Sequence, residues 1–310
     1  MSRIVVNGAS GAIGSLIVEE LVRDMAPQDL TLVTRNPARL ARWAERGINV
    51  VQGDYNDPAS LERAYAGGGA LMMISGLNIL KRVPEHHNAI EAAKAAGIDH
   101  IVYTSVSGVH PMNRTPSSSD HYATEVMLWE SGLSFTALRN QAYQELMTPM
   151  AEVALRTGEW RHVGENGLFS PVSRSDIARC AATILRAPEK HRRVSYEITG
   201  PDLISFQDLA ARFAALYDRP IRYIPVTADE MWALFDAWGA PRIGNPDATD
   251  PPHTFGSNEL VENYVAWDEL FHAVVSRHVE FITGRKAVTL DETMRAAKPT
   301  MLAHLAQPVG

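Results

Sequence analysis

Short apolar runs alternate with longer amphipathic stretches through the first half of the chain. The β-branched runs at 3–8, 30–35, 48–54, 70–75, 100–105 and 134–139 predict six strands. Apolar positions at helical spacing predict helices at 12–24, 37–47, 57–67, 84–97 and 118–132. Parallel strands need long crossover connections, so this alternation predicts an α/β fold with a doubly wound parallel Rossmann sheet.

The alternation breaks after residue 140. We expect helices at 173–188 and 205–218, strands at 194–201 and 221–226, and a helical, aromatic-rich region from residue 227 onward. We therefore predict two domains. Residues 1–140, with 170–190 packed on them, form the sheet domain, and residues 141–310 form a smaller, mainly helical domain that covers the carboxyl edge of the sheet. The sequence does not assign a role to residues 240–310.

Composition and charge exclude several classes of protein. The chain of 310 residues has a net charge of -7, which argues against binding to nucleic acid through phosphate neutralisation. It has no run of 18 apolar residues and begins with a strand rather than a signal peptide, so we expect a cytoplasmic protein without a membrane segment. The single cysteine, Cys180, lies on the apolar side of a predicted helix and is expected to be buried.

A glycine-rich turn follows the first predicted strand. Gly8, Gly11 and Gly14 are spaced three residues apart, whereas the common dinucleotide fingerprint is Gly-x-Gly-x-x-Gly. The shift changes the geometry of the turn but keeps its purpose, because backbone without side chains can approach a pyrophosphate at a helix N-terminus. The turn therefore predicts a dinucleotide site formed by Gly8, Ser10, Gly11, Ala12, Ile13 and Gly14.

Residues at the ends of the other strands are predicted to complete the dinucleotide site and to determine which cofactor it binds. Arg35 follows the second strand, where an NAD-specific site carries an acid, so we assign it to the 2′-phosphate of NADP(H). A solvated arginine is the alternative. Asp54 can accept a hydrogen bond from the adenine or serve as a turn residue. The remaining assignments to the cofactor are Ser75, Gly76, Ser105, Asn140 and Gln141, the last two near the nicotinamide.

Several stretches resemble a known family. "VNGASGAIG", "TRNP", "VVQGDYNDPASLERAYAG", "IVYTSVSGV" and "SGLSFTALRNQAY" are similar to the NmrA-like group of atypical short-chain dehydrogenase/reductases. Within it the bacterial type-2 quinone oxidoreductases and triphenylmethane reductases are the nearest. The resemblance covers about residues 3–240. It implies an NADP-binding fold that passes hydride to flat conjugated acceptors, and the family also includes redox sensors that bind the nucleotide without reducing anything.

The usual catalytic pair of short-chain reductases is incomplete. Those enzymes use Tyr-x-x-x-Lys, but the stretch "DHYATEV" places Tyr122 four residues before Val126. A tyrosine without its lysine is a poor acid at neutral pH. The related quinone reductases have His, Thr, Glu and Lys here, which His121, Thr124 and Glu125 match and Val126 does not. We take Tyr122 and His121 as the catalytic candidates, with packing against the cofactor and a solvent-facing position as their respective alternatives.

The acceptor site and partners are predicted last. Tyr143, Trp232, Phe235 and Trp238 are assigned to a planar substrate, although such aromatics often form a core. The adjacent His86 and His87 do not share a helix face, so we predict no metal. The function expected is an NADPH-dependent reductase of a conjugated, aromatic small molecule such as a quinone, enone, quinone methide or dye. The rival is a non-catalytic NADP(H) sensor, and a homodimer is possible in either case.

Overall fold

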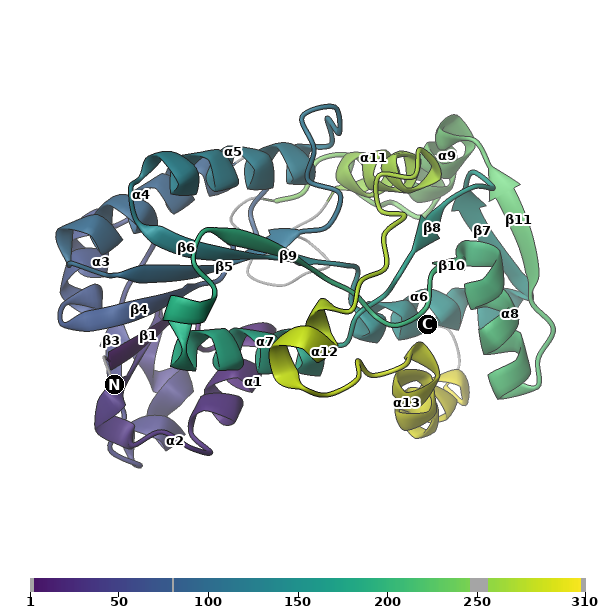
Figure 1. The fold of residues 1–310 in the computed structure, drawn as a ribbon. Helices are drawn as coiled ribbons and strands as arrows, with labels where there is room; N and C mark the ends of the chain where they lie inside the picture. The colour runs from purple at the N-terminus through teal and green to yellow at the C-terminus, as the bar shows by residue number, and fades with distance from the viewer. Residues whose placement is uncertain (1–2, 80, 246–255, 308–310) are drawn as a thin grey trace.

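Seven parallel strands form the central sheet of the computed structural model, which describes residues 3–79, 81–245 and 256–307 (Figure 1). The strand order is β3-β2-β1-β4-β5-β6-β9. The bounds are Arg3–Asn7 (β1), Leu30–Thr34 (β2), Asn49–Gln52 (β3), Gly68–Met73 (β4), His100–Val106 (β5), Ser134–Asn140 (β6) and Val194–Ile198 (β9). The six predicted strands are confirmed, as is the doubly wound parallel fold.

Helices cover both faces of this sheet. On one face lie α3 (Pro58–Tyr65), α4 (Arg82–Ala95) and α5 (Pro116–Glu130). On the other lie α1 (Ala12–Leu21), α2 (Ala41–Ala44), α7 (Arg174–Arg186) and α12 (His278–Thr283). The expected helix at 37–47 is instead a 3₁₀ turn, Pro37–Leu40, followed by the short α2. Further 3₁₀ turns span Pro27–Asp29 and Pro188–Lys190.

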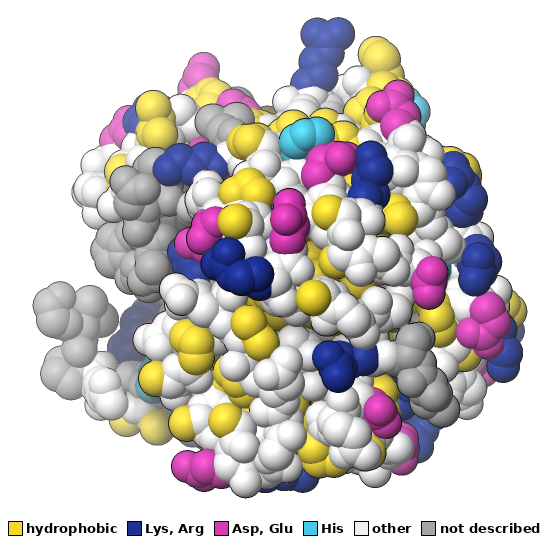
Figure 2. Space-filling model, turned by 90° about the vertical axis from the view of Figure 1, so that its left-hand side faces the viewer, with side chains coloured by type: hydrophobic (Ala, Val, Ile, Leu, Met, Phe, Trp, Pro, Cys, Tyr) yellow, Lys and Arg dark blue, Asp and Glu magenta, His cyan; other side chains and the backbone are white. Residues whose placement is uncertain are grey.

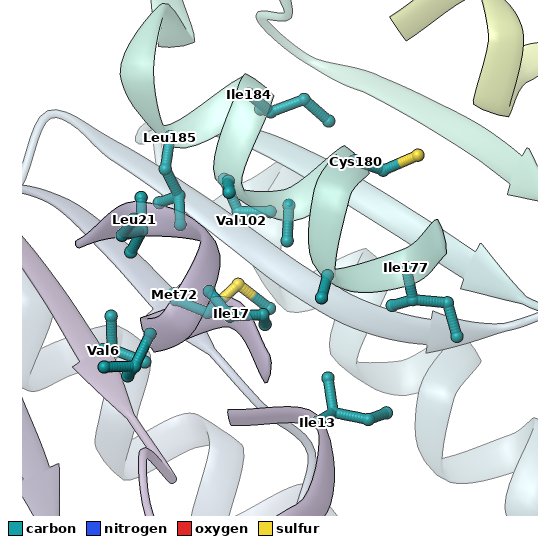
Figure 3. Packing of buried hydrophobic residues seen from close by; sticks show 14 of the residues in the cluster. Val6, Ile13, Ile17, Leu21, Met72, Val102, Ile177, Cys180, Ile184 and Leu185 are labelled. Carbon is teal, nitrogen blue, oxygen red and sulfur yellow. The ribbon is translucent and has the colours of Figure 1, made fainter. Parts of the chain in front are cut away.

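The core under α1 and α7 shows how the sequence pattern becomes packing (Figure 3). Val6 of β1 and Ile13 and Ile17 of α1 lie in one buried cluster (Figure 3). Alternate residues of a strand point to the same side of the sheet, and residues three or four apart lie on the same face of a helix, so such positions can meet in one core. Cys180 of α7 is fully buried in the same cluster, which confirms its predicted place, and burial raises the pKa of its thiol.

Apart from α7, α12 and β9, which belong to the central sheet and its cover, the described chain after residue 140 forms two small sheets and five helices. β7 (Glu159–Val163) pairs in parallel with β11 (Arg222–Val226), and β8 (Leu168–Phe169) pairs antiparallel with β10 (Ile204–Ser205). The helices are α6 (Gln144–Thr157), α8 (Phe206–Tyr217), α9 (Ala228–Ala237), α11 (Ser257–Asp268) and α13 (Leu290–Leu305). Aromatic rings pack between these elements: Phe169 stacks on both Phe206 and Trp267, and Phe206 lies tilted against Trp267.

Later segments return to the first part of the structure. β9 pairs with β6, and α7 and α12 pack on the sheet (Figure 1). A division into residues 1–140 and 141–310 therefore stays a prediction, and we propose that the sheet domain also includes α7, β9 and α12.

The surface is mixed in charge. On the face shown in Figure 2, basic and acidic side chains are interspersed over the described residues. None of the described helices combines the length and the apolar character that crossing a bilayer requires.

Candidate functional site

The turn after β1 excludes a side chain at two of its glycines, Gly8 and Gly14. Gly8 has φ +79°, a left-handed conformation that favours glycine, and its N–H donates to the carbonyl of Val33. A Cβ on Gly14 would lie 2.2 Å from the carbonyl oxygen of Gly8, so only glycine lets α1 pack this closely on β1. The N-cap of α1, Gly11, has no side-chain cap, and the first turn, which begins with Ala12 and Ile13, contains no acid. Its free N–H groups and positive end suit an anion.

This turn lies at the switch point of the sheet. The strand order runs outward from β1 in both directions, first to β2 and β3 and then to β4. Ligands of doubly wound sheets bind at the carboxyl edge at such a point. The geometry of Gly8, Gly11 and Gly14 therefore fits the phosphates of a dinucleotide.

Arg35, which is predicted to distinguish NADP(H) from NAD(H), lies at the end of β2. Arg35 is exposed directly after the strand. Burial raises the pKa of the nearby Glu85, and the positive charge of Arg35 only partly opposes that rise. The hydroxyl of Ser10 shares a 2.8 Å hydrogen bond with Thr34, which ties the glycine turn to β2. The side chain of Asp54 accepts a 2.9 Å hydrogen bond from the N–H of Asn56, which is a turn role. Its contact with an adenine stays a prediction.

The loop after β4 is fastened to its neighbours through its backbone. The N–H of Ser75 donates to Thr104 at 2.8 Å, and the N–H of Gly76 donates to Nε2 of His86 at 3.3 Å. Arg82 donates through Nε to the carbonyl of Gly76 at 2.7 Å. Two buried side chains of α4 thus hold this loop at the carboxyl edge, beside the glycine turn.

A buried polar cluster continues from that loop toward α5. The hydroxyl of Tyr103 lies 2.6 Å from Nδ1 of His121, and Nδ1 of His86 lies 2.8 Å from the hydroxyl of Thr124. Burial lowers the pKa of His121 well below its usual value, and the nearby cation of Arg82 lowers it further. Burial likewise lowers the pKa of His86 to about 3. Both rings are therefore neutral at neutral pH. His121 is 4% exposed, so the alternative of a solvent-facing ring is wrong.

An ion-pair network lies behind the cluster. Ser105 donates its hydroxyl proton to Glu125 at 2.6 Å, and the same carboxylate accepts two hydrogen bonds from Arg139. Arg139 also lies 3.5 Å from Glu197, which accepts a hydrogen bond from Ser107. The side chain of Ser105, which we assigned to the cofactor, is thus engaged inside the protein, and its contact with a cofactor stays a prediction.

Asn140 and Gln141, at the end of β6, differ in the hydrogen bonds of their side-chain amides. The amide of Gln141 donates to Ser107 at 3.3 Å and to the carbonyl of His272 at 2.7 Å. Both polar atoms of the Asn140 amide are buried and make no hydrogen bond of normal length within the described residues. Burial raises the pKa of the nearby Tyr143 phenol, and the Asn140 amide weakly opposes that rise. A buried amide without a partner is costly, because its polar atoms have lost their hydrogen bonds to water. The contacts of Asn140 and Gln141 with the nicotinamide stay predictions, and the amide of Gln141 is already engaged within the protein.

Tyr122 does not join the polar cluster. Its side chain is 41% exposed on α5, one turn before the half-buried Val126. No hydrogen bond of its hydroxyl is found among the described residues. A catalytic role for Tyr122 stays a prediction.

The predicted substrate residues have different surroundings. The ring of Tyr143 is half-buried beside Asn140 and lies under the guanidinium of Arg174, 5.2 Å from it. Trp232 and Phe235 are half-buried in a small cluster with Met231 and Val261. Trp238 is 62% exposed at the end of α9. The core alternative fits Trp232 and Phe235, and a contact of any of these rings with a substrate stays a prediction.

Sequence reasoning missed several members of the site. Arg82, His86, Tyr103, Arg139 and Glu197 come from separate elements and meet only in the fold. One signal was available, since a charged residue in the apolar strand "SFTALRN" requires a buried partner. His86 and His87 do not gather with a third ligand, and no metal-binding group is found in the described parts of the chain.

Comparison with known proteins gives a consistent result. Residues 8–188 match the NAD(P)H-binding family. The sequence is 32% identical to quinone oxidoreductase 2 of Escherichia coli over 240 residues, which is 77% of this chain and 82% of that protein. The structure is similar to the NADPH complex of E. coli quinone oxidoreductase QOR2, with a TM-score of 0.86, 28% identity and coverage of 96% of this chain and 100% of the other.

A second solved structure extends the comparison. Triphenylmethane reductase of Citrobacter sp., in complex with NADP(H), gives a TM-score of 0.81 at 25% identity and covers 95% of this chain and 99% of its own. The family matched covers more than half of the sequence, in agreement with the resemblance seen in its motifs. The chain belongs to the NAD(P)H-binding, NmrA-like family.

Proposed function

We propose that this protein is an NADPH-dependent reductase that delivers hydride to a conjugated, aromatic small molecule. The observation that carries the proposal is at the carboxyl edge of the sheet. A phosphate-binding turn stands there beside a neutral polar cluster, and Val126 occupies the position of the usual catalytic lysine. Two of the similar proteins are named a quinone oxidoreductase and a triphenylmethane reductase, which supports this class of acceptor.

The residues present fit the cofactor. Gly8, Gly11 and the first turn of α1 would hold the pyrophosphate, because a side chain on Gly14 is excluded and the helix N-terminus has no cap of its own. Arg35 would hold the 2′-phosphate and Asn140 the nicotinamide amide. When bound, NADPH supplies the hydride. The protein orients the two partners and excludes water, which suffices for an acceptor that is already electron-poor.

The absorbance of NADPH, followed with a panel of quinones, enones and triphenylmethane dyes, tests the proposal. Oxidation that depends on one of these acceptors is the expected result. Tight binding of NADPH without oxidation by any acceptor would favour the sensor function instead. A cytoplasmic location and a homodimer stay predictions.

A further inference from the structure

The hydrogen bonds of the buried cluster determine where each proton lies. The backbone N–H of Gly76 can only donate, so Nε2 of His86 accepts and the proton of this neutral ring lies on Nδ1. That Nδ1–H points at Thr124, 2.8 Å away. Thr124 can accept it, because its own hydroxyl proton goes to the carbonyl of Asp120 at 2.8 Å.

The hydrogen-bond partners of His121 determine the position of its ring proton in the same way. Nδ1 of His86 already carries its proton and lies 3.5 Å from the oxygen of Tyr103, so it cannot accept the phenolic proton. The phenol of Tyr103 also interacts with Thr124, but that hydroxyl already accepts the proton of His86. Nδ1 of His121, at 2.6 Å from the phenolic oxygen, is the acceptor within close hydrogen-bond distance. Burial raises the pKa of Tyr103, so the phenol keeps its proton at neutral pH and donates it. His121 therefore carries its single proton on Nε2.

We infer that His121 donates a hydrogen bond, through Nε2–H, to the carbonyl oxygen of the acceptor, and that Tyr103 is the positioning residue that fixes this tautomer. The inference rests on the proposed function and narrows its substrates to conjugated carbonyl compounds such as quinones and enones. Nε2 has no partner in the described part of the chain, and the ring lies in the cluster that fastens the loop after β4 to the carboxyl edge.

The role is that of a polarising donor and not of an acid. A neutral imidazole that gives up its proton becomes a strongly basic imidazolate, which makes proton transfer unfavourable. A neutral N–H can still stabilise charge on an oxygen, as a neutral histidine does in triosephosphate isomerase. The acceptor gains two electrons and one proton as hydride, negative charge develops on its oxygen, and water supplies the second proton. A cationic triphenylmethane dye has no such oxygen and gains nothing from this donor.

The pH dependence separates a donor from an acid. The groups that face His121 are Arg82 and His86 from α4 and Tyr103 from β5, with Asp120 and Glu125 on α5 itself close to that phenol. The cation and burial both keep the imidazole neutral, so kcat for a quinone should not change between about pH 6.5 and 9. A rate that falls tenfold per pH unit above about pH 6.5 would show that the imidazolium acts as an acid and would overturn the inference.

Three variants test the tautomer and its use. His121→Phe should lower kcat for 1,4-benzoquinone by about 100-fold and leave the affinity for NADPH unchanged. His121→Gln should recover part of the loss, because its amide can also donate. The Tyr103→Phe variant should fold and have a lower kcat. Tyr223→Phe is the matched control, because it removes the hydroxyl of another tyrosine, one that donates to the carbonyl of Gly164, and it should keep kcat. ¹⁵N NMR should show protonated Nε2 of His121 in the original protein and a mixture of tautomers in Tyr103→Phe.

The results distinguish this inference from the proposed function. If the original protein binds NADPH and reduces no acceptor, the proposed function is wrong. If it reduces a quinone and both His121→Phe and Tyr103→Phe keep the rate, or if NMR places the proton on Nδ1, the inference alone is wrong. Should His121→Phe fail to fold, Tyr103→Phe and the NMR spectrum decide.

Discussion

The carboxylate of Glu125 accepts two hydrogen bonds from the guanidinium of Arg139, from Nε at 3.0 Å and from Nη2 at 2.6 Å. The pair joins α5 to β6 directly behind the candidate site. The Glu125 side chain is 5% exposed and the Arg139 side chain 28%. Their hydrogen bonds raise the pKa of Arg139 and keep its charge in place.

Removal of one partner should leave a charge poorly compensated. Glu125→Ala should lower the free energy of unfolding by about 3 kcal/mol, measured by urea denaturation. Glu91→Ala, which breaks the exposed pair with Lys94, should cost less than about 1 kcal/mol. Equal losses in the two variants would show that the buried pair contributes no more than a surface pair.

Arg35→Ala tests the choice of cofactor. The affinity for NADPH should fall by about tenfold or more, because a charge-assisted contact with the 2′-phosphate is lost, and the affinity for NADH should hardly change. Fluorescence titration with each nucleotide measures both values. Arg39→Ala, an exposed arginine four residues further on, is the control. Comparable losses for both nucleotides would contradict the assignment.

Asn140→Leu should separate stability from binding. In the protein without ligand, replacing the unpartnered buried amide by an apolar side chain should raise the free energy of unfolding by about 1 kcal/mol. The affinity for NADPH should fall by about tenfold, since one hydrogen bond is lost. Asn113→Leu should instead destabilise the protein, because the amide of Asn113 already bonds to the carbonyl of Gly108 and the N–H of Thr115. A destabilised Asn140→Leu variant would mean that this amide is satisfied without ligand.

His162 should make stability depend on pH. Burial lowers the pKa of its ring to about 3, and the ring stacks on Phe206 with centroids 3.5 Å apart. Between that value and an unfolded pKa of about 6.5 the unfolded chain binds the extra proton, so stability falls as the pH drops through this window.

The variant His162→Phe keeps an aromatic stack and removes the titrating group. The free energy of unfolding, measured from pH 7 to pH 4, should depend on pH less steeply by about one proton. His87→Phe, at an exposed position, should leave the dependence as it was. An unchanged slope in His162→Phe would assign the pH dependence to other groups.

Much of the sheet could be predicted because its strands are apolar runs separated by amphipathic helices. The hydrophobic pattern of a strand does not show which other strand it pairs with. The run at 194–201 was expected as a strand, but nothing in it indicates that β9 pairs with β6. The strands at 159–163 and 168–169 were missed because they are short and interrupted by polar residues.

The site divides in the same way. The turn from Gly8 to Gly14 is local, so its geometry could be predicted from its glycines. The cluster of His86, Tyr103 and His121 brings together three elements that are adjacent only in space. His121 was recognised, but its tautomer depends on partners that no local pattern reveals.

The placement of β9 has a consequence for biosynthesis. In the sheet, Thr136 of β6 pairs with Val194 of β9, which is synthesised much later. The helix α12, which packs on α7 and β9, follows only at His278–Thr283. While the ribosome makes the intervening segments, β6 is an open edge with unpaired N–H and C=O groups, the kind of edge on which other chains aggregate. The nascent protein should therefore depend on chaperones until translation has passed residue 198, and ribosome stalling before that point should favour aggregation.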